Sequence, residues 1–245
     1  MVISQVLISR PGPEASELAG MLRHAGLMPV VIPAFNFESD YTGLDFNSSW
    51  HGDGRKLVIF CSPRAVEFGL RQLPAGFLDE LEIAAIGPAT ANLLESAGQT
   101  VTILPDGEFN SEALLANPAL NERAGEALIF AAPGGRQALF SGLKKRSWQV
   151  EFAHVYRMVP LAADASAIEA LEQDSQIISV WTSAKAMGHL SESLGKKAWE
   201  NVCRGQFVVT SKRLADLAQA HAPGRVHVTD GPGNTDIMNC IAQLI

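Results

Sequence analysis

The sequence predicts an α/β protein built from two similar, doubly wound parallel sheets. Short apolar runs of strand length alternate along the whole chain with stretches at helical spacing. The pattern also occurs twice, because KLVIFCSPRAVEFGLRQL from Lys56 is matched by ISVWTSAKAMGHLSESL from Ile178, with Ser62 and Ser183 at the same point of each copy. Alternating strands and helices form βαβ units and a mainly parallel sheet. Runs such as LVIFC are apolar on both faces, as strands covered by helices on both sides require.

The elements follow the same order in both copies. The strand QVLIS is followed by a Pro/Gly turn, by a helix that stops at Gly26, and by the strand MPVVIP. The segment EALIFAAPGGRQALFSGLKKRSWQVEFAHVYRMVP repeats this order, and the two segments close at Pro33 and Pro160.

The last pair of segments has the same internal order. EIAAIGPATANLLESAGQTVTILPDGEFNSEALLANPAL and QFVVTSKRLADLAQAHAPGRVHVTDGPGNTDIMNCIAQLI each predict a strand, a turn, a helix, a strand, a loop and a final amphipathic helix. Periodicity alone suggests two domains of about 120 residues in series, without indicating whether the chain crosses between them. The polar, Gly-rich stretch FNFESDYTGLDFNSSWHGDGRK and the stretch LAADASA are candidate crossings.

Composition places the chain among ordinary globular proteins. Of the 245 residues, 47% are hydrophobic and 18% are charged, and the apolar runs are too short to span a membrane. The first residues, MVISQVLISRPG, lack a basic and apolar signal-peptide pattern. The three cysteines, at positions 61, 203 and 240, have no CxxC spacing, which favours buried thiols in a reducing cytoplasm over a metal site. The net charge of −7 disfavours nucleic-acid binding.

The common catalytic signatures are absent from the sequence. No GxGxxG, GxxxxGK[ST] or GxSxG motif occurs, the six histidines are scattered, and no paired carboxylates follow a strand. Hydroxyl groups and backbone N–H groups remain as candidate ligands.

Six predicted turns join the carboxyl end of a strand to the start of a helix, which is where doubly wound sheets bind ligands. Helix N-termini favour anions, and five of the six turns also carry Arg or Lys. Helix capping alone is the simpler explanation for each serine or threonine. Six such turns in an acidic chain nevertheless predict a locally cationic site for a polyanion. The turns contain Ser9, Arg10 and Pro11; Ser62, Pro63 and Arg64; Gly87, Pro88, Ala89 and Thr90; Pro133, Gly134, Gly135 and Arg136; Thr182, Ser183 and Lys185; and Thr210, Ser211, Lys212 and Arg213.

The chain has two tyrosines, Tyr41 in the polar stretch and Tyr156 at the end of the strand FAHVY. Packing explains a strand tyrosine as readily as chemistry does. A phenolic hydroxyl is protonated at neutral pH and can donate to a leaving oxygen.

From end to end the chain resembles the uroporphyrinogen-III synthase family. The resemblance rests on LISRPGPEASELAGMLRHAGLMPVVIP, VIFCSPRAVEF, AAIGPATANLLESAG, GGRQALFSGL, VYRMVP and VWTSAKAM, taken in order and spacing. It implies two α/β domains joined by a two-stranded linker, with a cleft between them. Residues 1–35 and 165–245 would form the first domain and residues 40–155 the inserted second, with FNF near Phe35 and VYRMV near Tyr156 in the linker.

The resemblance also implies a reaction and a site. The family cyclises hydroxymethylbilane, a linear octacarboxylate tetrapyrrole, with inversion of ring D and loss of water, and uses no metal or cofactor. Tyr156 and Thr90 align with the family's catalytic and cleft residues. The expected substrate-binding residues are Ser9, Arg10, Ser62, Arg64, Gly87, Ala91, Gly135, Arg136, Ser183, Ala184, Lys185, Ser211 and Lys212. In the last turn VVTSKRLADL departs from the family pattern, and Arg213 occupies the expected threonine position.

Two alternatives stay open on sequence. A non-catalytic binder of a polyanionic small molecule needs the same turns but not Tyr156. An interaction module like a response regulator is disfavoured, because no acidic cluster follows a strand. We expect a cytoplasmic monomer with no nucleic-acid or membrane partner, in transient contact at most with the preceding pathway enzyme.

Overall fold

The chain folds as two compact units. The computed structural model describes residues 5–40, 54–173 and 176–245. Unit 1 contains Met1–Asn36 and Val159–Ile245, and unit 2 contains Phe37–Met158. Unit 1 therefore includes both ends of the chain, and unit 2 is inserted between them. Tyr41 lies outside the described residues.

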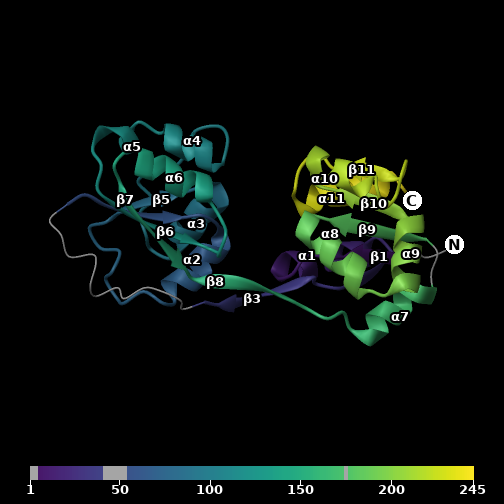
Figure 1. The fold of residues 1–245 in the computed structure, drawn as a ribbon. Helices are drawn as coiled ribbons and strands as arrows, with labels where there is room; N and C mark the ends of the chain where they lie inside the picture. Colours follow the sequence, from purple (N-terminus) through teal and green to yellow (C-terminus); the bar gives the residue numbers. More distant parts are fainter. Residues whose placement is uncertain (1–4, 41–53, 174–175) are drawn as a thin grey trace. The chain divides into compact units, whose positions relative to one another are not determined.

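Unit 1 contains a five-stranded sheet in the order β11-β10-β9-β1-β2, and every neighbouring pair of strands is parallel (Figure 1). Its strands are β1 (Gln5–Ile8), β2 (Met28–Val31), β9 (Ile177–Trp181), β10 (Gln206–Val209) and β11 (Val226–Val228). Its helices are α1 (Pro13–His24), α7 (Ala165–Gln173), α8 (Ala184–Ser193), α9 (Lys196–Arg204), α10 (Lys212–Ala218) and α11 (Asn234–Ala242).

Unit 2 contains a four-stranded parallel sheet in the order β5-β4-β6-β7. Beyond β5, Ile103 forms a parallel bridge to Ala84. The strands are β4 (Lys56–Phe60), β5 (Glu82–Ala85), β6 (Glu126–Ala131) and β7 (Gln149–His154). The helices are α2 (Pro63–Leu70), α3 (Pro88–Ser96), α4 (Ser111–Ala116), α5 (Ala119–Glu122) and α6 (Gln137–Lys145).

Each sheet is buried on both faces. In β4, Val58 and Phe60 pack into the core that contains the buried residues of α2 and α3, whereas Leu57 and Ile59 face the core formed with α4 and α6. Alternate residues of β1 divide between two cores in the same way. The predicted class, a doubly wound parallel α/β fold, is confirmed. Among the described residues, no helix is both long and apolar enough to cross a bilayer.

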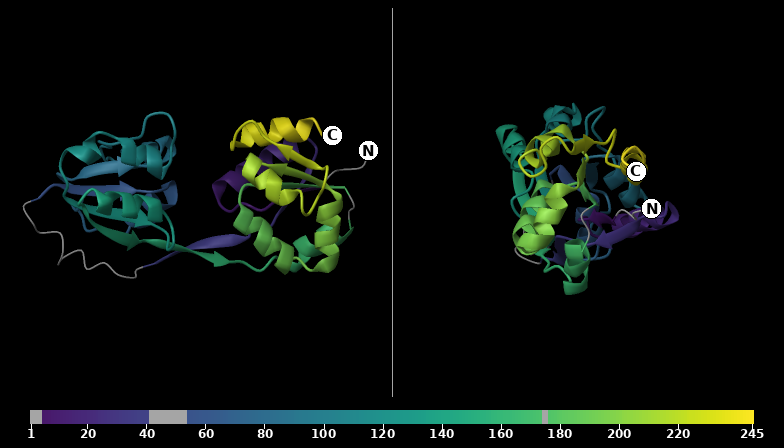
Figure 2. Two further views of the ribbon diagram at one scale, coloured as in Figure 1. Left: turned by 45° about the horizontal axis from the view of Figure 1, so that its top comes forward. Right: turned by 90° about the vertical axis from the view of Figure 1, so that its right-hand side faces the viewer.

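Two strands connect the units. β3 (Phe35–Ser39) and β8 (Tyr156–Pro160) pair as a separate two-stranded sheet (Figure 2). The backbone N–H of Leu161 donates to the carbonyl oxygen of Ala34 at 3.0 Å, and that of Asp40 donates to Val155 at 3.1 Å. The linker places Tyr156 at the first position of β8, directly after the end of the unit 2 sheet.

The two sheets have equivalent hydrogen bonds at their strand ends. The N–H of Ile86 donates to the carbonyl oxygen of Phe60 at 3.2 Å, and the N–H of Thr210 donates to that of Trp181 at 3.3 Å. This equivalence aligns β4 and β5 with β9 and β10. The residue two positions after Phe60 is Ser62, and the residue two positions after Trp181 is Ser183, so the repeated serine of the sequence has a structural counterpart in each unit.

Candidate functional site

The carboxyl ends of neighbouring strands bring three of the predicted turns together in each unit. In unit 2, β5, β4 and β6 are adjacent and end at the turns that begin α3, α2 and α6. In unit 1, β10, β9 and β1 are adjacent and end at the turns that begin α10, α8 and α1. Parallel strands end at the same edge of a sheet, so each unit presents one row of helix N-termini.

Three of the candidate serines cap helices. Ser62 Oγ accepts a hydrogen bond from the N–H of Ala65 at 3.1 Å, and Ser183 accepts one from Ala186 at 3.4 Å. Ser211 accepts one from Leu214 at 3.3 Å. The simpler capping explanation therefore accounts for one lone pair of each hydroxyl. The hydroxyl hydrogen takes no part in the cap and stays able to donate.

Ser62 has a second partner, which the other two serines lack among the described residues. Its Oγ lies 3.2 Å from the phenolic oxygen of Tyr156, 94 residues further along the chain. The tyrosine ring stacks on Phe68, with centroids 5.7 Å apart and 25° between the planes, and meets the edge of Phe37 at 5.7 Å and 72°. The phenol is thus held in one orientation beside the N-terminus of α2.

A glycine in the last turn allows α2 to pack closely against the unit 2 sheet. Gly69 is in the last turn of α2 and packs against Phe130 and Phe60, whose rings stack 4.8 Å apart. A Cβ atom at position 69 would lie 2.7 Å from Cδ1 of Phe130. Carbon atoms in contact prefer about 3.5–4.0 Å, so a side chain here would push α2 away from the sheet.

The cations of the turns fall into two groups. Nη1 of Arg64 is 2.7 Å from Oε2 of Glu67, and its guanidinium lies 5.0 Å from the centre of the Phe37 ring. Arg10 donates to Oδ1 of Asn234 at 3.1 Å. The other four cations are exposed and form no ion pair within the described part of the chain: Arg136, Lys185, Lys212 and Arg213.

The Pro133–Arg136 turn brings Arg136 near a buried thiol. Gly134 has φ 75° and Arg136 has φ 57°, both in the left-handed region, and the N–H of Gly135 donates to Ala132 at 3.1 Å. Burial raises the pKa of the Cys61 thiol to about 12, and the positive charge of Arg136 opposes that shift. Cys61 stays a neutral, protonated group at the end of β4, so the positive charge of Arg136 is not neutralised by a thiolate.

Three predicted site residues are buried. Ser9 is 1% exposed, and its hydroxyl donates to the carbonyl oxygen of Val180 at 2.9 Å, which joins the end of β1 to β9. Thr90 is 3% exposed and Ala91 4% exposed, both within the packed face of α3. These three side chains lie in the protein interior beneath the turns. The backbone of Gly87 lies nearer the surface at this edge than these three side chains.

The threonine position expected at Arg213 requires a correction. The N–H of Ala91 donates to Gly87, and the N–H of Ala215 donates to Ser211, so Gly87 and Ser211 are equivalent first residues. Thr90 then corresponds to Leu214, not to Arg213, and Leu214 is also buried. The predicted alignment was displaced by one residue because α10 lacks the Gly-Pro start of α3.

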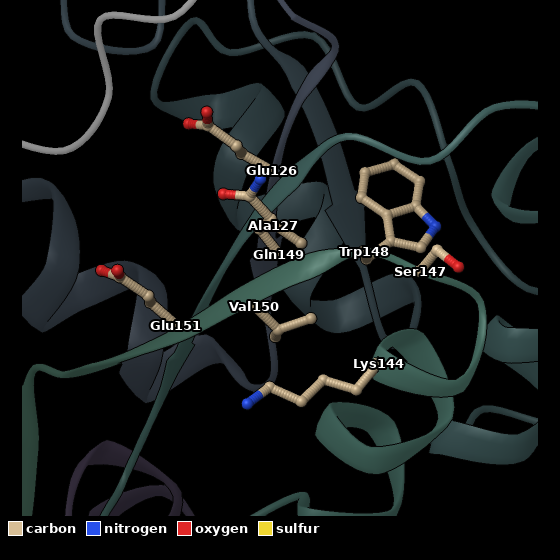
Figure 3. A pocket seen from close by; sticks show the side chains of 8 residues that line it. All are labelled: Glu126, Ala127, Lys144, Ser147, Trp148, Gln149, Val150 and Glu151. Carbon is tan, nitrogen blue, oxygen red and sulfur yellow. The ribbon is translucent and has the colours of Figure 1, made fainter.

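A cavity of about 510 Å³ lies elsewhere on unit 2. Figure 3 shows its lining, in which Lys144 extends from α6, while Glu126 and Gln149 are the first residues of β6 and β7. It is therefore at the amino end of the sheet, away from the turns. No group of three metal-ligating side chains occurs among the residues that the structure describes.

Sequence reasoning missed the aromatic residues around Tyr156. Phe68 lies six positions after Ser62, and His189 lies six positions after Ser183. The ring of His189 packs on Phe35 at 5.3 Å, as that of Phe68 packs on Tyr156. The equal spacing of these two rings from the repeated serines is the sequence signal that could have identified them. Unit 1 therefore has Phe35 at the place where unit 2 has its phenol.

Comparison with known proteins gives a consistent result. The family model described as uroporphyrinogen-III synthase HemD matches residues 16–238. The chain is 26% identical over 245 residues to uroporphyrinogen-III synthase of Escherichia coli (strain K12), covering 96% of this chain and 99% of that protein. The solved uroporphyrinogen-III synthetase of Helicobacter pylori 26695 has a TM-score of 0.66 at 14% identity, covering 99% of this chain and 100% of that one. A mutant uroporphyrinogen III synthase of Thermus thermophilus has a TM-score of 0.59 at 18% identity, covering 98% of each chain. These two structures support the fold.

Proposed function

The chain belongs to the uroporphyrinogen-III synthase family, and from this we propose that its strand-end turns bind hydroxymethylbilane while Tyr156 donates a proton to the departing hydroxyl. The enzyme is a cyclising lyase of tetrapyrrole biosynthesis. The C–O bond of the hydroxymethyl group breaks, and the oxygen leaves as water. The freed carbon bonds to the substituted position of ring D. The resulting spiro intermediate fragments and recloses with ring D inverted.

The contact between Ser62 and Tyr156 carries the proposal for the first step. The N–H of Ala65 donates to Ser62 Oγ, which leaves the serine hydrogen free to donate to the phenolic oxygen. The phenolic hydrogen is then free to point at the substrate. When it passes to the leaving oxygen, the serine hydroxyl stabilises the phenolate that forms. A positioned proton donor of this kind contributes about 10²–10⁴-fold to a rate.

The turns have the chemistry to hold the carboxylates. Free N–H groups and helix dipoles at the N-termini of α2, α3, α6 and α8 attract anions, and the exposed Arg136, Lys185 and Lys212 add positive charge. Hydrogen bonds to charged groups contribute about 1.5–3 kcal/mol each. Several such bonds could hold the flexible tetrapyrrole in a curled form, which favours closure by orientation.

We also propose a monomer that works in the cytoplasm and receives its substrate from the preceding pathway enzyme. The three cysteines are free, as is usual for proteins of a reducing compartment.

An isomer assay tests the proposed roles. Freshly made hydroxymethylbilane closes to the type I product without enzyme, whereas the enzyme directs it to type III. We expect Tyr156→Phe to retain the folded structure, because the ring and its contacts with Phe68 and Phe37 are kept, and to lower kcat about 100-fold with little change in KM. Unchanged turnover would remove Tyr156 from the reaction.

A further inference from the structure

Phe109 has a solvent-exposed aromatic side chain. It is 51% exposed, and the other exposed large apolar side chains among the described residues are aliphatic. It lies just before α4, in the segment LPDGEFN, and no role has been given to it above. Exposed aromatic rings are enriched where a protein contacts a partner or ligand.

The ring lies against the turn that follows β5. A Cβ atom at Gly87 would be 3.1 Å from Cβ of Phe109 and 3.4 Å from its Cγ. Gly87 has φ −166° and ψ 172°, an extended conformation that any residue adopts. The lack of a side chain at position 87 is therefore explained by the closeness of Phe109. The pair places an exposed aromatic ring beside the N-terminus of α3, in the row of turns described above.

The segment that carries Phe109 is fixed at both ends. On one side, Oδ1 of Asn110 caps α4 by accepting from the N–H of Ala113 at 2.8 Å, and its Nδ2 donates to Glu108 at 2.8 Å. On the other side, Nδ2 of Asn117 donates to the carbonyl oxygen of Leu104 at 3.4 Å. The exposure of the ring is thus imposed by an ordered segment.

We propose that Phe109 contacts the face of one pyrrole ring of the bound tetrapyrrole and so helps the enzyme to distinguish this substrate from other polycarboxylates. The inference rests on the proposed function. Helix N-termini and cations attract the carboxylates of the substrate but provide no aromatic or apolar surface for its ring faces. A phenylalanine ring does, through stacked or edge-to-face contact.

The charges around Phe109 agree with a ring contact. Asp106 and Glu108 are exposed on the same segment. Their carboxylates repel the acetate and propionate arms of the substrate. They therefore favour the presentation of a pyrrole face, and not of a carboxylate arm, at this point of the edge.

The test compares Phe109→Ala with Phe109→Trp. We expect the alanine variant to raise KM for hydroxymethylbilane about tenfold, which corresponds to about 1.4 kcal/mol, and the tryptophan variant to retain the wild-type value. Both should fold, since the side chain is half exposed. Met28→Ala is the control. Met28 is equally exposed at 50%, but it is the first residue of β2 and therefore lies at the amino end of a strand, whereas the predicted turns follow the carboxyl ends. It should leave KM unchanged.

A spectroscopic readout separates ring contact from a structural effect. The wild-type protein has four tryptophans, so the fluorescence of Trp at position 109 is obtained by subtracting the wild-type emission from that of Phe109→Trp. Adding the uroporphyrinogen III product anaerobically should quench the fluorescence obtained in this way. An unchanged KM in the alanine variant, an equal rise in both variants, or no quenching would overturn the proposal. Failure of the wild-type protein to form type III product would instead reject the proposed function.

Discussion

Replacing Ser62 by alanine separates the capping role of this residue from its contact with Tyr156. The serine hydroxyl accepts from the N–H of Ala65 and lies 3.2 Å from the phenolic oxygen. Ser183 and Ser211 cap α8 and α10 in the same way but have no phenol beside them among the described residues. These two serines are therefore matched controls in the same protein.

The contacts of Ser62 predict an effect on stability and an effect on turnover. Loss of an N-cap side chain costs about 1 kcal/mol of stability, so each of the three alanine variants should lose about that amount. The hydrogen bond from Ser62 contributes about 1 kcal/mol while the phenol is neutral and about 1.5–3 kcal/mol once the charged phenolate forms. The gain of about 1 kcal/mol as the proton leaves corresponds to about a fivefold fall in kcat when the hydroxyl is removed. Ser183→Ala and Ser211→Ala can raise KM through weaker carboxylate binding, but should leave kcat within about twofold.

The assay is urea unfolding of each variant together with kcat at saturating hydroxymethylbilane. In the Tyr156→Phe background, Ser62→Ala should have no further effect on kcat, because the partner of the hydroxyl is already absent. An equal fall of kcat in all three serine variants would refute the reasoning, since it would show that the helix caps, and not the phenol, connect these serines to turnover.

Two further predictions concern stability. Gly69→Ala should lower the free energy of unfolding by about 1–3 kcal/mol, because its Cβ would lie 2.7 Å from Phe130, and urea titration against Gly20→Ala, which has open space at its Cβ, checks this. The pKa of Cys61 is raised from 9.0 to about 12 in the folded chain. The resulting contribution to the free energy of unfolding is therefore fully present below about pH 9 and is lost as the pH rises through about 12. The loss should approach about 4 kcal/mol, and Cys61→Ala should remove this part of the alkaline destabilisation; an unchanged pH profile would contradict the assignment.

The fold was predictable because its signals are local and repeated. Strands such as β4, in which four of five residues are fully buried, carry an apolar run that only a sheet covered on both faces explains. The turns were predictable too, since Ser62, Ser183 and Ser211 are capping residues directly before a helical pattern.

The remaining features depend on contacts between distant parts of the chain. The Ser62–Tyr156 contact joins residues 94 positions apart, and the bond from Ser9 to Val180 joins residues 171 positions apart. No local sequence pattern specifies that the hydroxyl of Ser62 meets a phenol while that of Ser9 is buried and bonded to a neighbouring strand. The misplacement of Arg213 has a related cause, because Leu214 is identified as the equivalent of Thr90 only by the hydrogen bonds that begin the two helices.

The repeat leads to a last prediction, on Phe35→Tyr. Phe35 packs on His189 at 5.3 Å in unit 1, as Tyr156 packs on Phe68 at 5.7 Å in unit 2, so this change supplies unit 1 with an equivalent phenol. We expect the variant to be as stable as wild type and to have unchanged kcat. In the Tyr156→Phe background it should restore no turnover.

The reason lies in the substrate. Hydroxymethylbilane has its hydroxymethyl group at one end only, and a chain bound in one direction brings that end to one phenol. The carboxyl edges of the two units also differ in charge, because Arg64 is paired with Glu67 whereas its counterpart Lys185 is exposed. Restored type III formation in the double variant would mean that the tetrapyrrole binds in either direction, and the assignment of the leaving hydroxyl to unit 2 would then be wrong.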